Sequence, residues 1–340
     1  MYRFLQYKRK GEGAIVKKKK KQILIIIFLL LILSFLFLIS ELLISGEKTE
    51  VYNISIIVRG GNSESWMIMK QGAEQAASEM NVNISFITLS NENNVKDQKD
   101  LIEREIISGA DAIVISPVDY EEMREPIEEA MKKVPVVLIE STINTKKDIH
   151  YISCNNYELG ENLAEELMKM GNTRSKIAIM GRNLNSSSIK DRYKGFTDAI
   201  KKSKNTYDLL DISGNEEVIY NEAKNIIENN LSDVIVTFDP DVLEIVGKVK
   251  RDFMYAKKRN IGIEIYGSGI TSKGISFLEE NIINSIAVQN DFNIGYLGIK
   301  TAVDEIKGNN VKNKTIYSTI INTRTMYSDE NQRLLFPFIR

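Results

Sequence analysis

The sequence has few of the residues on which most enzyme chemistry depends. Its 340 residues include one cysteine, Cys154, and one histidine, His150. A single cysteine excludes an intrachain disulfide and a thiolate metal site. A single histidine leaves almost nothing for the catalytic pairings of histidine with serine or cysteine. The sequence therefore gives no support for a hydrolase of either kind.

Two short motifs suggest other chemistry, and both are incomplete. The Gly-Ser-Gly of residues 267–269 with Gly274 resembles a phosphate-binding loop, but no Lys-Ser or Lys-Thr follows Gly274 and the dinucleotide spacing is absent. Asp239 and Asp241, on either side of Pro240, could attract a cation, but two neighbouring acids are a common surface feature. We therefore predict no cofactor, no metal and no catalytic residues, and we expect that the protein is not an enzyme.

Basic residues are scarce outside the start of the chain. Residues 1–46 hold nine of the 45 Lys and Arg residues and only two of the 46 Asp and Glu residues, so the rest of the chain is net acidic. A nucleic-acid partner requires a basic face. We therefore exclude nucleic acid as a partner.

One long apolar run interrupts the polar start of the chain. Within residues 23–44, only Ser34, Ser40 and Glu41 are polar. Such a run is long enough to cross a hydrocarbon layer of about 30 Å as one helix. The basic flank before it predicts that residues 1–22 are cytoplasmic, that 23–44 form a transmembrane anchor, and that the chain after Ser45 lies outside.

A cleaved secretory signal is the alternative to this anchor. The apolar run is longer than a usual signal core, and the Ile-Ser-Gly of residues 44–46 is a weak cleavage site. A lipoprotein signal needs a cysteine directly after the run, and the sequence has none there. An uncleaved anchor in the cell membrane, with an extracytoplasmic domain, is therefore the preferred prediction.

From residue 52 the sequence alternates short apolar runs with helical stretches. The runs are continuous rather than alternating, which is typical of parallel strands covered on both faces by helices. The pattern restarts near residue 153, so we predict an α/β fold of two doubly wound parallel-sheet lobes. The expected strands lie at residues 54–58, 83–89, 111–116, 134–139, 149–153, 176–180, 207–212, 233–238, 261–266, 285–289 and 316–322.

The expected helices fill the intervals between these strands. One is expected over residues 120–132, and the segment after residue 322 is expected to be a polar tail. Ligands of open parallel sheets bind beyond the carboxyl ends of the strands. We therefore expect a ligand between the two lobes.

Several short motifs follow one another over residues 52–322, nearly all of the chain after the apolar run. They are Trp66 with Gly72-Ala73, Val134-Pro135-Val136-Val137, Cys154-Asn155-Asn156-Tyr157-Glu158 with Gly160, Arg192 with Gly195-Phe196, and Gln289-Asn290-Asp291 with Gly295. Taken in series, these motifs resemble the type I periplasmic binding proteins of the ribose and galactose class.

The resemblance implies that three strands cross between the lobes as a hinge, near residues 153–156, 288–291 and 320–322. The N-terminal lobe would then comprise residues 51–153 and 291–315. The C-terminal lobe would comprise residues 156–288 and 320–340.

The resemblance also implies a ligand site, in which aromatic rings stack on a sugar and charged or amide groups bind its hydroxyls. This chain departs from the family at two positions: Ser141 stands where the ribose-type proteins have an arginine, and Gly269 where they have an aspartate. The implied site residues are Trp66, Glu140, Asn155, Lys190, Asp239 and Gln289, with Ser63 and Ser65 nearby.

Some of these residues have a structural interpretation as well. Trp66 continues the apolar stripe of the first helix, Asp239 can cap a helix, and Lys190 can be a solvated helix residue. Arg192 is expected to brace its loop rather than touch ligand, and Cys154 to be a small buried hydrophobe.

The predicted function is that of a membrane-anchored solute-binding protein that closes on a small polar ligand, expected to be a sugar. Amino-acid or lactate-like ligands of related folds remain open. Closure about a hinge would give a membrane partner a shape to recognise. That partner is either the permease of an ABC-type importer or a transmembrane sensor such as a histidine kinase, in which case the protein has no transport role.

Overall fold

The computed structural model describes residues 24–40, 51–60, 63–90, 92–212, 214–257, 261–310 and 313–336. The chain forms two separate units, Met1–Glu50 and Val51–Arg340. Each unit is described by itself below.

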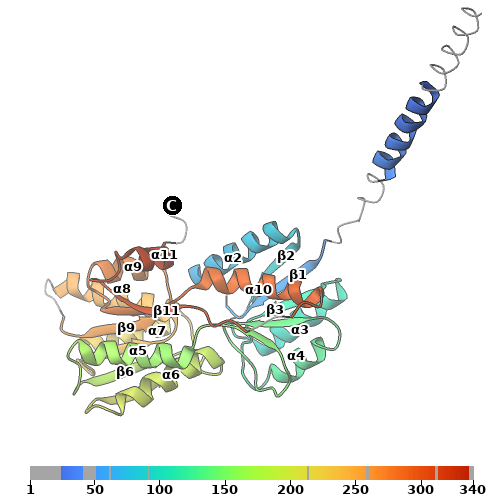
Figure 1. Ribbon diagram of the computed structural model, residues 1–340. Helices are drawn as coiled ribbons and strands as arrows, with labels where there is room; N and C mark the ends of the chain where they lie inside the picture. The colour runs from blue at the N-terminus through green and yellow to red at the C-terminus, as the bar shows by residue number, and fades with distance from the viewer. Residues whose placement is uncertain are drawn as a thin grey trace, which may run out of the picture. The chain divides into compact units, whose positions relative to one another are not determined.

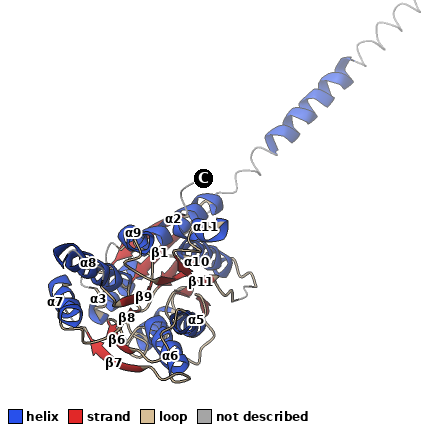
Figure 2. Ribbon diagram, turned by 90° about the vertical axis from the view of Figure 1, so that its left-hand side faces the viewer, coloured by secondary structure: helices blue, strands red, loops and turns tan. Residues whose placement is uncertain are grey.

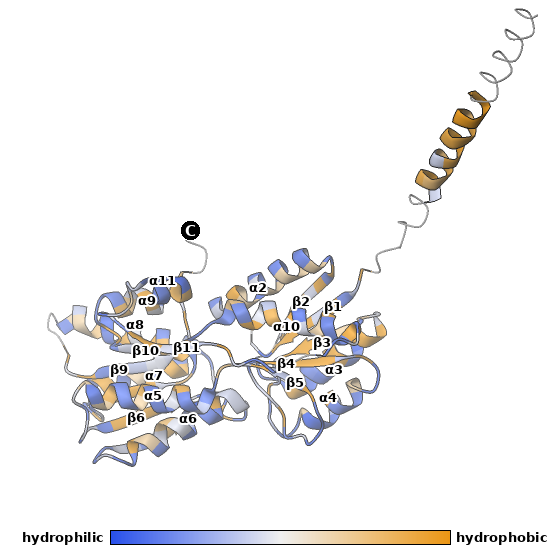
Figure 3. Ribbon diagram, viewed as in Figure 1, coloured by the Kyte–Doolittle hydropathy of each residue, from blue (hydrophilic) through white to orange (hydrophobic). Residues whose placement is uncertain are grey.

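The described part of the first unit is one helix over residues 24–40, which is exposed and apolar along most of its length (Figure 3). Across the described ranges, no helix combines the length and the apolar character needed to cross a membrane. Residues 23 and 41–44 of the predicted anchor, and the predicted cytoplasmic segment 1–22, lie outside the described residues.

The second unit begins with a fully parallel sheet of five strands in the order β2-β1-β3-β4-β5. We call this sheet and the helices packed on it the N-terminal lobe (Figure 1). Its strands are β1 Asn53–Val58, β2 Asn83–Thr88, β3 Ala112–Ile115, β4 Val136–Ile139 and β5 His150–Ile152, and its helices are α2 Glu64–Met80, α3 Val95–Ile107, α4 Arg124–Ala130 and α10 Asp291–Ile306.

The second sheet has six strands in the order β11-β10-β9-β8-β6-β7, and only the pair β10 and β11 is antiparallel. This sheet and its helices form the C-terminal lobe. Its strands are β6 Lys176–Gly181, β7 Thr206–Asp211, β8 Val234–Thr237, β9 Glu264–Ser268, β10 Ser285–Gln289 and β11 Ser318–Asn322, and its helices are α5 Asn156–Lys169, α6 Ser187–Ile200, α7 Glu216–Glu228, α8 Pro240–Lys257, α9 Ser272–Glu279 and α11 Asp329–Leu335.

Apolar side chains are buried on both faces of each sheet, as the continuous apolar strands predict. In the N-terminal lobe, α2 and α10 cover one face and α3 and α4 the other. In the C-terminal lobe, α5 and α6 lie on one side of the strands and α7 and α8 on the other (Figure 2). The prediction of two doubly wound lobes is confirmed.

Two of the glycines in the family motifs allow one pair of helices to touch. A Cβ at Gly72 of α2 would lie 1.9 Å from the backbone oxygen of Phe292, and a Cβ at Gly295 of α10 would lie 1.9 Å from that of Met69. No side chain fits at such distances. The two glycines therefore allow α10, the helix with which the chain returns to the N-terminal lobe, to pack closely against α2.

The chain crosses between the lobes three times. It passes from β5 to α5 at residues 153–155, from β10 to α10 at residue 290, and from α10 to β11 at residues 307–317. Ser153 and Thr315 form an isolated parallel bridge, and the Asn290 N–H donates to the Tyr317 carbonyl at 3.1 Å. Residues 320–322, predicted as the third crossing, lie inside β11, because the crossing occurs before that strand begins.

The remaining differences concern the ends of elements. Only residues 124–130 of the expected helix 120–132 form α4, and the strand expected at 261–266 lies at 264–268. The polar tail contains an additional helix, α11, which begins after Ser328; the Ser328 hydroxyl accepts a hydrogen bond from the Asn331 N–H. Leu334 and Leu335 bury this helix against the C-terminal lobe, and two apolar residues were too weak a signal to predict it.

Candidate functional site

A cleft lies between the two lobes at the carboxyl ends of their strands. Residues that follow β1, β2, β4, β6, β8 and β9, together with the end of β10, line it, as expected for parallel sheets. Its polar and aromatic lining residues are Arg59, Ser63, Ser65, Trp66, Glu92, Asn93, Glu140, Asn183, Arg192, Phe238, Asp239, Asp241, Gln289 and Asp291.

The lobes are closed on each other around this cleft. The Ser65 hydroxyl of α2 donates to the Ile270 carbonyl at 3.3 Å. At the rim, Arg182 Nη2 lies 2.7 Å from Glu92 Oε2. The Glu64 carboxylate accepts from both the backbone N–H and the hydroxyl of Ser272. Direct contacts therefore join the lobes on several sides of the site.

Glu140 and Arg59 form a buried ion pair on the wall of the cleft. Arg59 Nε lies 3.2 Å from Oε2 of Glu140 and Nη2 lies 3.1 Å from Oε1. Burial raises the pKa of Glu140, but the charge and hydrogen bonds of Arg59 outweigh it, and the pKa falls to about 2. Glu140 is therefore ionised at neutral pH, and its carboxylate is already paired.

Serine hydroxyls fill the remaining hydrogen-bond acceptor positions of the Glu140 carboxylate. Ser116 and Ser141 donate to Oε2 of Glu140 at 3.1 and 2.5 Å, and Ser188 of the other lobe donates to Oε1 at 2.6 Å. With the two bonds from Arg59, the acceptor capacity of a carboxylate is filled. Glu140 lines the cleft as predicted, but its carboxylate oxygens accept hydrogen bonds from protein side chains. Because Ser188 belongs to the other lobe, Glu140 also joins the two lobes.

The backbone of Glu140 is held in an unusual conformation. Its φ is +61°, in the left-handed region, where the backbone of any residue other than glycine has a raised free energy. Three hydrogen bonds hold it: its N–H donates to the Ile152 carbonyl at 3.0 Å, and its carbonyl accepts from Tyr151 and Ser153, both at 2.9 Å. The carboxylate is thereby aimed at Arg59.

The two departures from the family have structural reasons. Ser141 is fully buried, and its hydroxyl lies 2.7 Å from that of Ser186 and 2.9 Å from that of Ser188. A small hydroxyl joins the lobes where an arginine would fill the cleft. Gly269 has a φ of +100°, and a Cβ there would lie 2.6 Å from Pro240, so an aspartate does not fit without a shift of the backbone.

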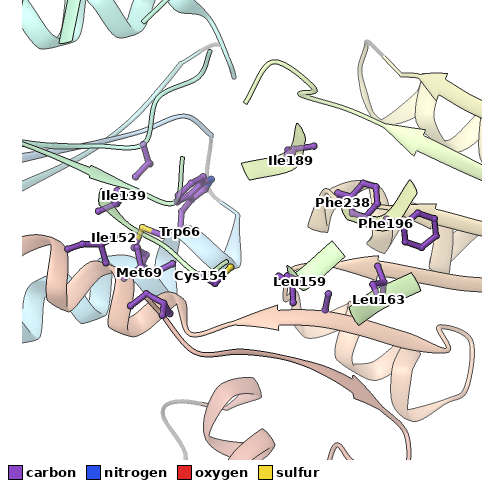
Figure 4. Packing of buried hydrophobic residues seen from close by; sticks show 14 of the residues in the cluster. Trp66, Met69, Ile139, Ile152, Cys154, Leu159, Leu163, Ile189, Phe196 and Phe238 are labelled. Carbon is purple, nitrogen blue, oxygen red and sulfur yellow. The ribbon is translucent and has the colours of Figure 1, made fainter. Parts of the chain in front are cut away.

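Trp66 is both a core residue and part of the cleft lining. Its exposed fraction is 8%, and it packs with the apolar residues of the N-terminal lobe. The guanidinium carbon of Arg59 lies 5.5 Å from the centroid of the indole ring. Figure 4 shows Trp66 on the N-terminal lobe and Phe238 on the C-terminal lobe. The two interpretations offered for Trp66 are therefore compatible.

Asp239 likewise combines its two interpretations. Its Oδ1 accepts from the backbone N–H groups of Asp241 and Val242, at 3.1 and 3.2 Å, and so caps α8. Its Oδ2 accepts from the Asn183 amide at 3.0 Å. For its neighbour Asp241, burial and the charges of Asp239 and Glu92 raise the pKa to about 7.

A second polar group lies where β10 leads into α10. Arg192 donates from Nε to Asn156 Oδ1 at 2.8 Å and from Nη2 to Gln289 Oε1 at 3.2 Å. The Gln289 amide donates to Asp291 Oδ1 at 2.9 Å. Burial raises the pKa of Asp291 to about 7 despite this bond. Arg192 thus braces the loop as expected, and it also lines the cleft.

Cys154 is buried, as predicted. Its thiol lies 3.1 Å from Gln289 Oε1, and burial raises its pKa. The thiol form is therefore favoured, which is unlike a reactive cysteine.

The structure places two predicted site residues outside the cleft lining. Asn155 is exposed, and its side chain caps α5 by accepting from the Glu158 N–H at 3.2 Å. Lys190 is exposed on α6, and its Nζ lies 5.5 Å from the ring centroid of Tyr120. The cleft-facing residue of this turn of α6 is Arg192 instead. Trp66, Glu140, Asp239 and Gln289 do lie in the lining, as do Ser63 and Ser65.

Sequence reasoning missed Arg59, Asn93, Asn183 and Asp291 as cleft residues. Arg59 and Asn93 follow β1 and β2, and Asn183 follows β6. The signal was available, because each is a polar residue just beyond the carboxyl end of a parallel strand. Asp291 belongs to a quoted family motif but was given no role.

Residues 54–310, most of the second unit, match the periplasmic binding protein domain family. The chain belongs to this family. Family membership agrees with the expectation that the protein binds a ligand rather than catalyses a reaction. It also confirms the type I resemblance.

Similar proteins include the ribose import binding protein RbsB of Haemophilus influenzae, which is 21% identical over 279 residues, or 80% of this chain and 92% of that protein. A carbohydrate transporter solute-binding protein from Agrobacterium radiobacter, solved with D-arabinose, superposes with a TM-score of 0.78 at 23% identity, over 85% of this chain and all of that one. The XylFII–LytSN complex gives a TM-score of 0.73 at 22% identity, over 81% of this chain and 98% of that one. At these identities the structural likeness shows the fold.

Proposed function

We propose that the protein is a sugar-binding subunit whose lobes close on a sugar or sugar derivative. The observation that carries this proposal is the cleft itself, where charged and amide side chains and two aromatic rings meet between closed lobes. Small-ligand sites commonly combine apolar walls with a few placed polar groups. The relatives named for ribose and D-arabinose support a sugar as the ligand.

Calorimetry on the full-length protein in detergent micelles tests this proposal. The panel should hold pentoses, hexoses, their amino derivatives and myo-inositol. We expect saturable one-to-one binding of at least one of them. Saturable binding of an amino acid or a hydroxy acid, with no response to any sugar, would contradict the proposal.

We propose a sensory partner in the membrane. The likeness to XylFII, which forms a complex with LytSN, favours a partner that recognises the closed conformation of the two lobes. The alternative is an importer, which is favoured by the likeness to an import binding protein. Deletion of the gene separates them: loss of sugar uptake indicates transport, whereas normal uptake with a lost transcriptional response to the sugar indicates sensing.

We further propose that residues 23–44 keep the chain in the membrane with its binding lobes outside. The apolar run and its one-sided basic flank support this arrangement. Mass spectrometry of the mature protein tests it. An intact N-terminus in the membrane fraction is expected, and a soluble protein that starts near Glu47 would contradict the anchor.

A further inference from the structure

The single histidine of the chain lies beside two of the crossings between the lobes. His150 begins β5, and the first crossing follows that strand at residues 153–155. Its ring nitrogens contact two other elements. Nε2 lies 2.6 Å from Glu305 Oε1 near the end of α10, and Nδ1 lies 3.2 Å from Asn313 Oδ1 in the third crossing. His150 therefore joins β5, α10 and the third crossing.

Both partners of the imidazole ring are hydrogen-bond acceptors. Glu305 presents a carboxylate oxygen, and Asn313 presents its amide oxygen. The backbone N–H of Tyr151 fixes the orientation of that amide, because it also donates to Asn313 Oδ1, at 3.3 Å. If the amide were rotated, its NH2 group would face the Tyr151 N–H, and two donors would meet. The ring must therefore donate from both nitrogens to satisfy both partners.

The charged form of histidine can do this, and the neutral form cannot. A neutral imidazole has one N–H and one acceptor nitrogen, whereas the imidazolium has two N–H donors. In the neutral form the bond to Glu305 is the stronger of the two, because its acceptor is ionised. The proton then stays on Nε2, and the lone pair of Nδ1 faces the oxygen of Asn313. Loss of the ring proton therefore breaks the contact with the third crossing.

One carboxylate balances the charge of the imidazolium. Among the described residues, Glu305 is the one acid that forms an ion pair with His150 within 4.0 Å. On β4, the residue paired with His150 is the apolar Val137. The other charged residues near His150 or its two partners in the chain are Lys147, Asp148, Asp304, Lys307 and Lys314. Of these, Lys147 pairs with Glu128 and Asp304 with Lys300.

We propose that His150 is a pH-sensitive clamp on the hinge: the imidazolium holds residues 313–317 of the third crossing to the N-terminal lobe, and the neutral imidazole releases them. Ser153 of the first crossing bonds to Thr315 and Ile316 of the same segment, so the clamp acts where two crossings lie side by side. The charge of histidine changes between about pH 5 and 8. The clamp is therefore complete in mild acid and weakened in mild alkali, whichever ligand the cleft binds.

Nitrogen NMR on the full-length protein in detergent micelles tests the ring itself, because one histidine gives one pair of ring signals. At about pH 5.5 both ring N–H protons should be visible, since hydrogen bonds slow their exchange with water. At about pH 8.5 the remaining proton should lie on Nε2, the nitrogen that faces the carboxylate. A proton on Nδ1 at the higher pH would overturn the proposal.

Hydrogen exchange followed by mass spectrometry measures the crossing. The protection of residues 313–317, corrected for the intrinsic exchange rate at each pH, should be roughly five-fold greater at about pH 5.5 than at about pH 8.5. His150→Gln has no titratable group at this position and should give equal protection at both pH values. Glu129→Gln is the control, because Glu129 of α4 pairs with Lys132 at the exposed surface, and it should keep the full pH response.

The variant also separates His150 from the other groups that titrate in this range. Asp241 and Asp291, with pKa values of about 7, change charge over the same interval in the unaltered protein and in His150→Gln alike. A pH response of residues 313–317 that persists in His150→Gln, or its absence from the unaltered protein, would overturn the clamp. Neither result involves a ligand, so the sugar-binding proposal would stand.

Discussion

Arg59 and Glu140 lie 81 residues apart in the sequence and form a two-bond ion pair on the wall of the cleft. Arg59 follows the first strand, and Glu140 follows the fourth. Their side chains are nearly fully buried, with exposed fractions of 9% and 4%. The pair therefore joins the carboxyl ends of β1 and β4 at the wall of the cleft.

Removal of one partner should destabilise the protein strongly. In Arg59→Met the Glu140 carboxylate stays buried without its cation, which typically costs about 3–5 kcal/mol. Urea unfolding followed by circular dichroism measures the free energy of unfolding. Lys96→Met is the control, because Lys96 pairs with Asp100 on an exposed helix surface. Equal stability of the two variants would contradict the importance of the buried pair.

The same pair predicts sensitivity to acid. The pKa of Glu140 lies near 2 in the folded protein, below the ordinary 4.5 of a free carboxyl group. The ionised group therefore stabilises the fold above about pH 4.5. This contribution is lost as the pH falls from 4.5 toward 2. In Glu140→Gln, the free energy of unfolding should change less over that range than in the unaltered protein, and parallel profiles would argue against the assignment.

Asp291 should have the opposite pH dependence. Its pKa is raised from 3.8 to about 7, so the folded state holds a proton that the unfolded state releases. Its contribution to stability is present below about pH 4 and is lost as the pH rises through 7. Asp291→Asn should therefore gain stability relative to the unaltered protein between pH 4 and 8. Thermal unfolding across this range tests it, and a constant difference would contradict the raised pKa.

Ser188 should control how far the lobes close. Its hydroxyl donates across the cleft to Glu140 at 2.6 Å, and a hydrogen bond to a charged group contributes about 1.5–3 kcal/mol. Ser188→Ala should shift the lobes toward an open state. Small-angle X-ray scattering should then show a larger radius of gyration. Ser203→Ala is the control, because that hydroxyl bonds within its own lobe: it donates to the Ile200 carbonyl and accepts from the Asn205 N–H.

Sequence reasoning predicted the fold well because local patterns determine it. The continuous apolar strands at residues 54–58 and 234–237 reflect burial on both sides of a sheet. The glycines at 72 and 295 were visible as motif residues. The short helix α11 was missed, because its burial depends on two leucines packed against the core of its own lobe rather than on a periodic apolar pattern.

The site was predictable only in part. Glu140, Asp239 and Gln289 lie in the cleft because they end or follow strands, and strand ends can be identified from sequence. Lys190 and Arg192 are two residues apart on α6 and therefore face different directions. Which of them faces the cleft depends on the rotation of the helix about its own axis. The hydrogen bonds from Ser188 and Arg59 to Glu140 join residues that are far apart in the chain. No local pattern in a single sequence predicts such contacts.

The single tryptophan provides the last prediction. Trp66 lines the cleft and is largely buried in the N-terminal lobe. A ligand between Trp66 and Phe238 should displace water near the indole and shift its emission, and no second tryptophan masks the signal. Because Trp66 also packs in the core, Trp66→Ala should cost about 3–5 kcal/mol of stability. Trp66→Phe should retain most of that stability while removing the fluorescence signal. Fluorescence titration and urea unfolding measure the two effects. A ligand that binds by calorimetry but leaves the emission unchanged would place the indole outside the ligand contact and leave it only its role in the core.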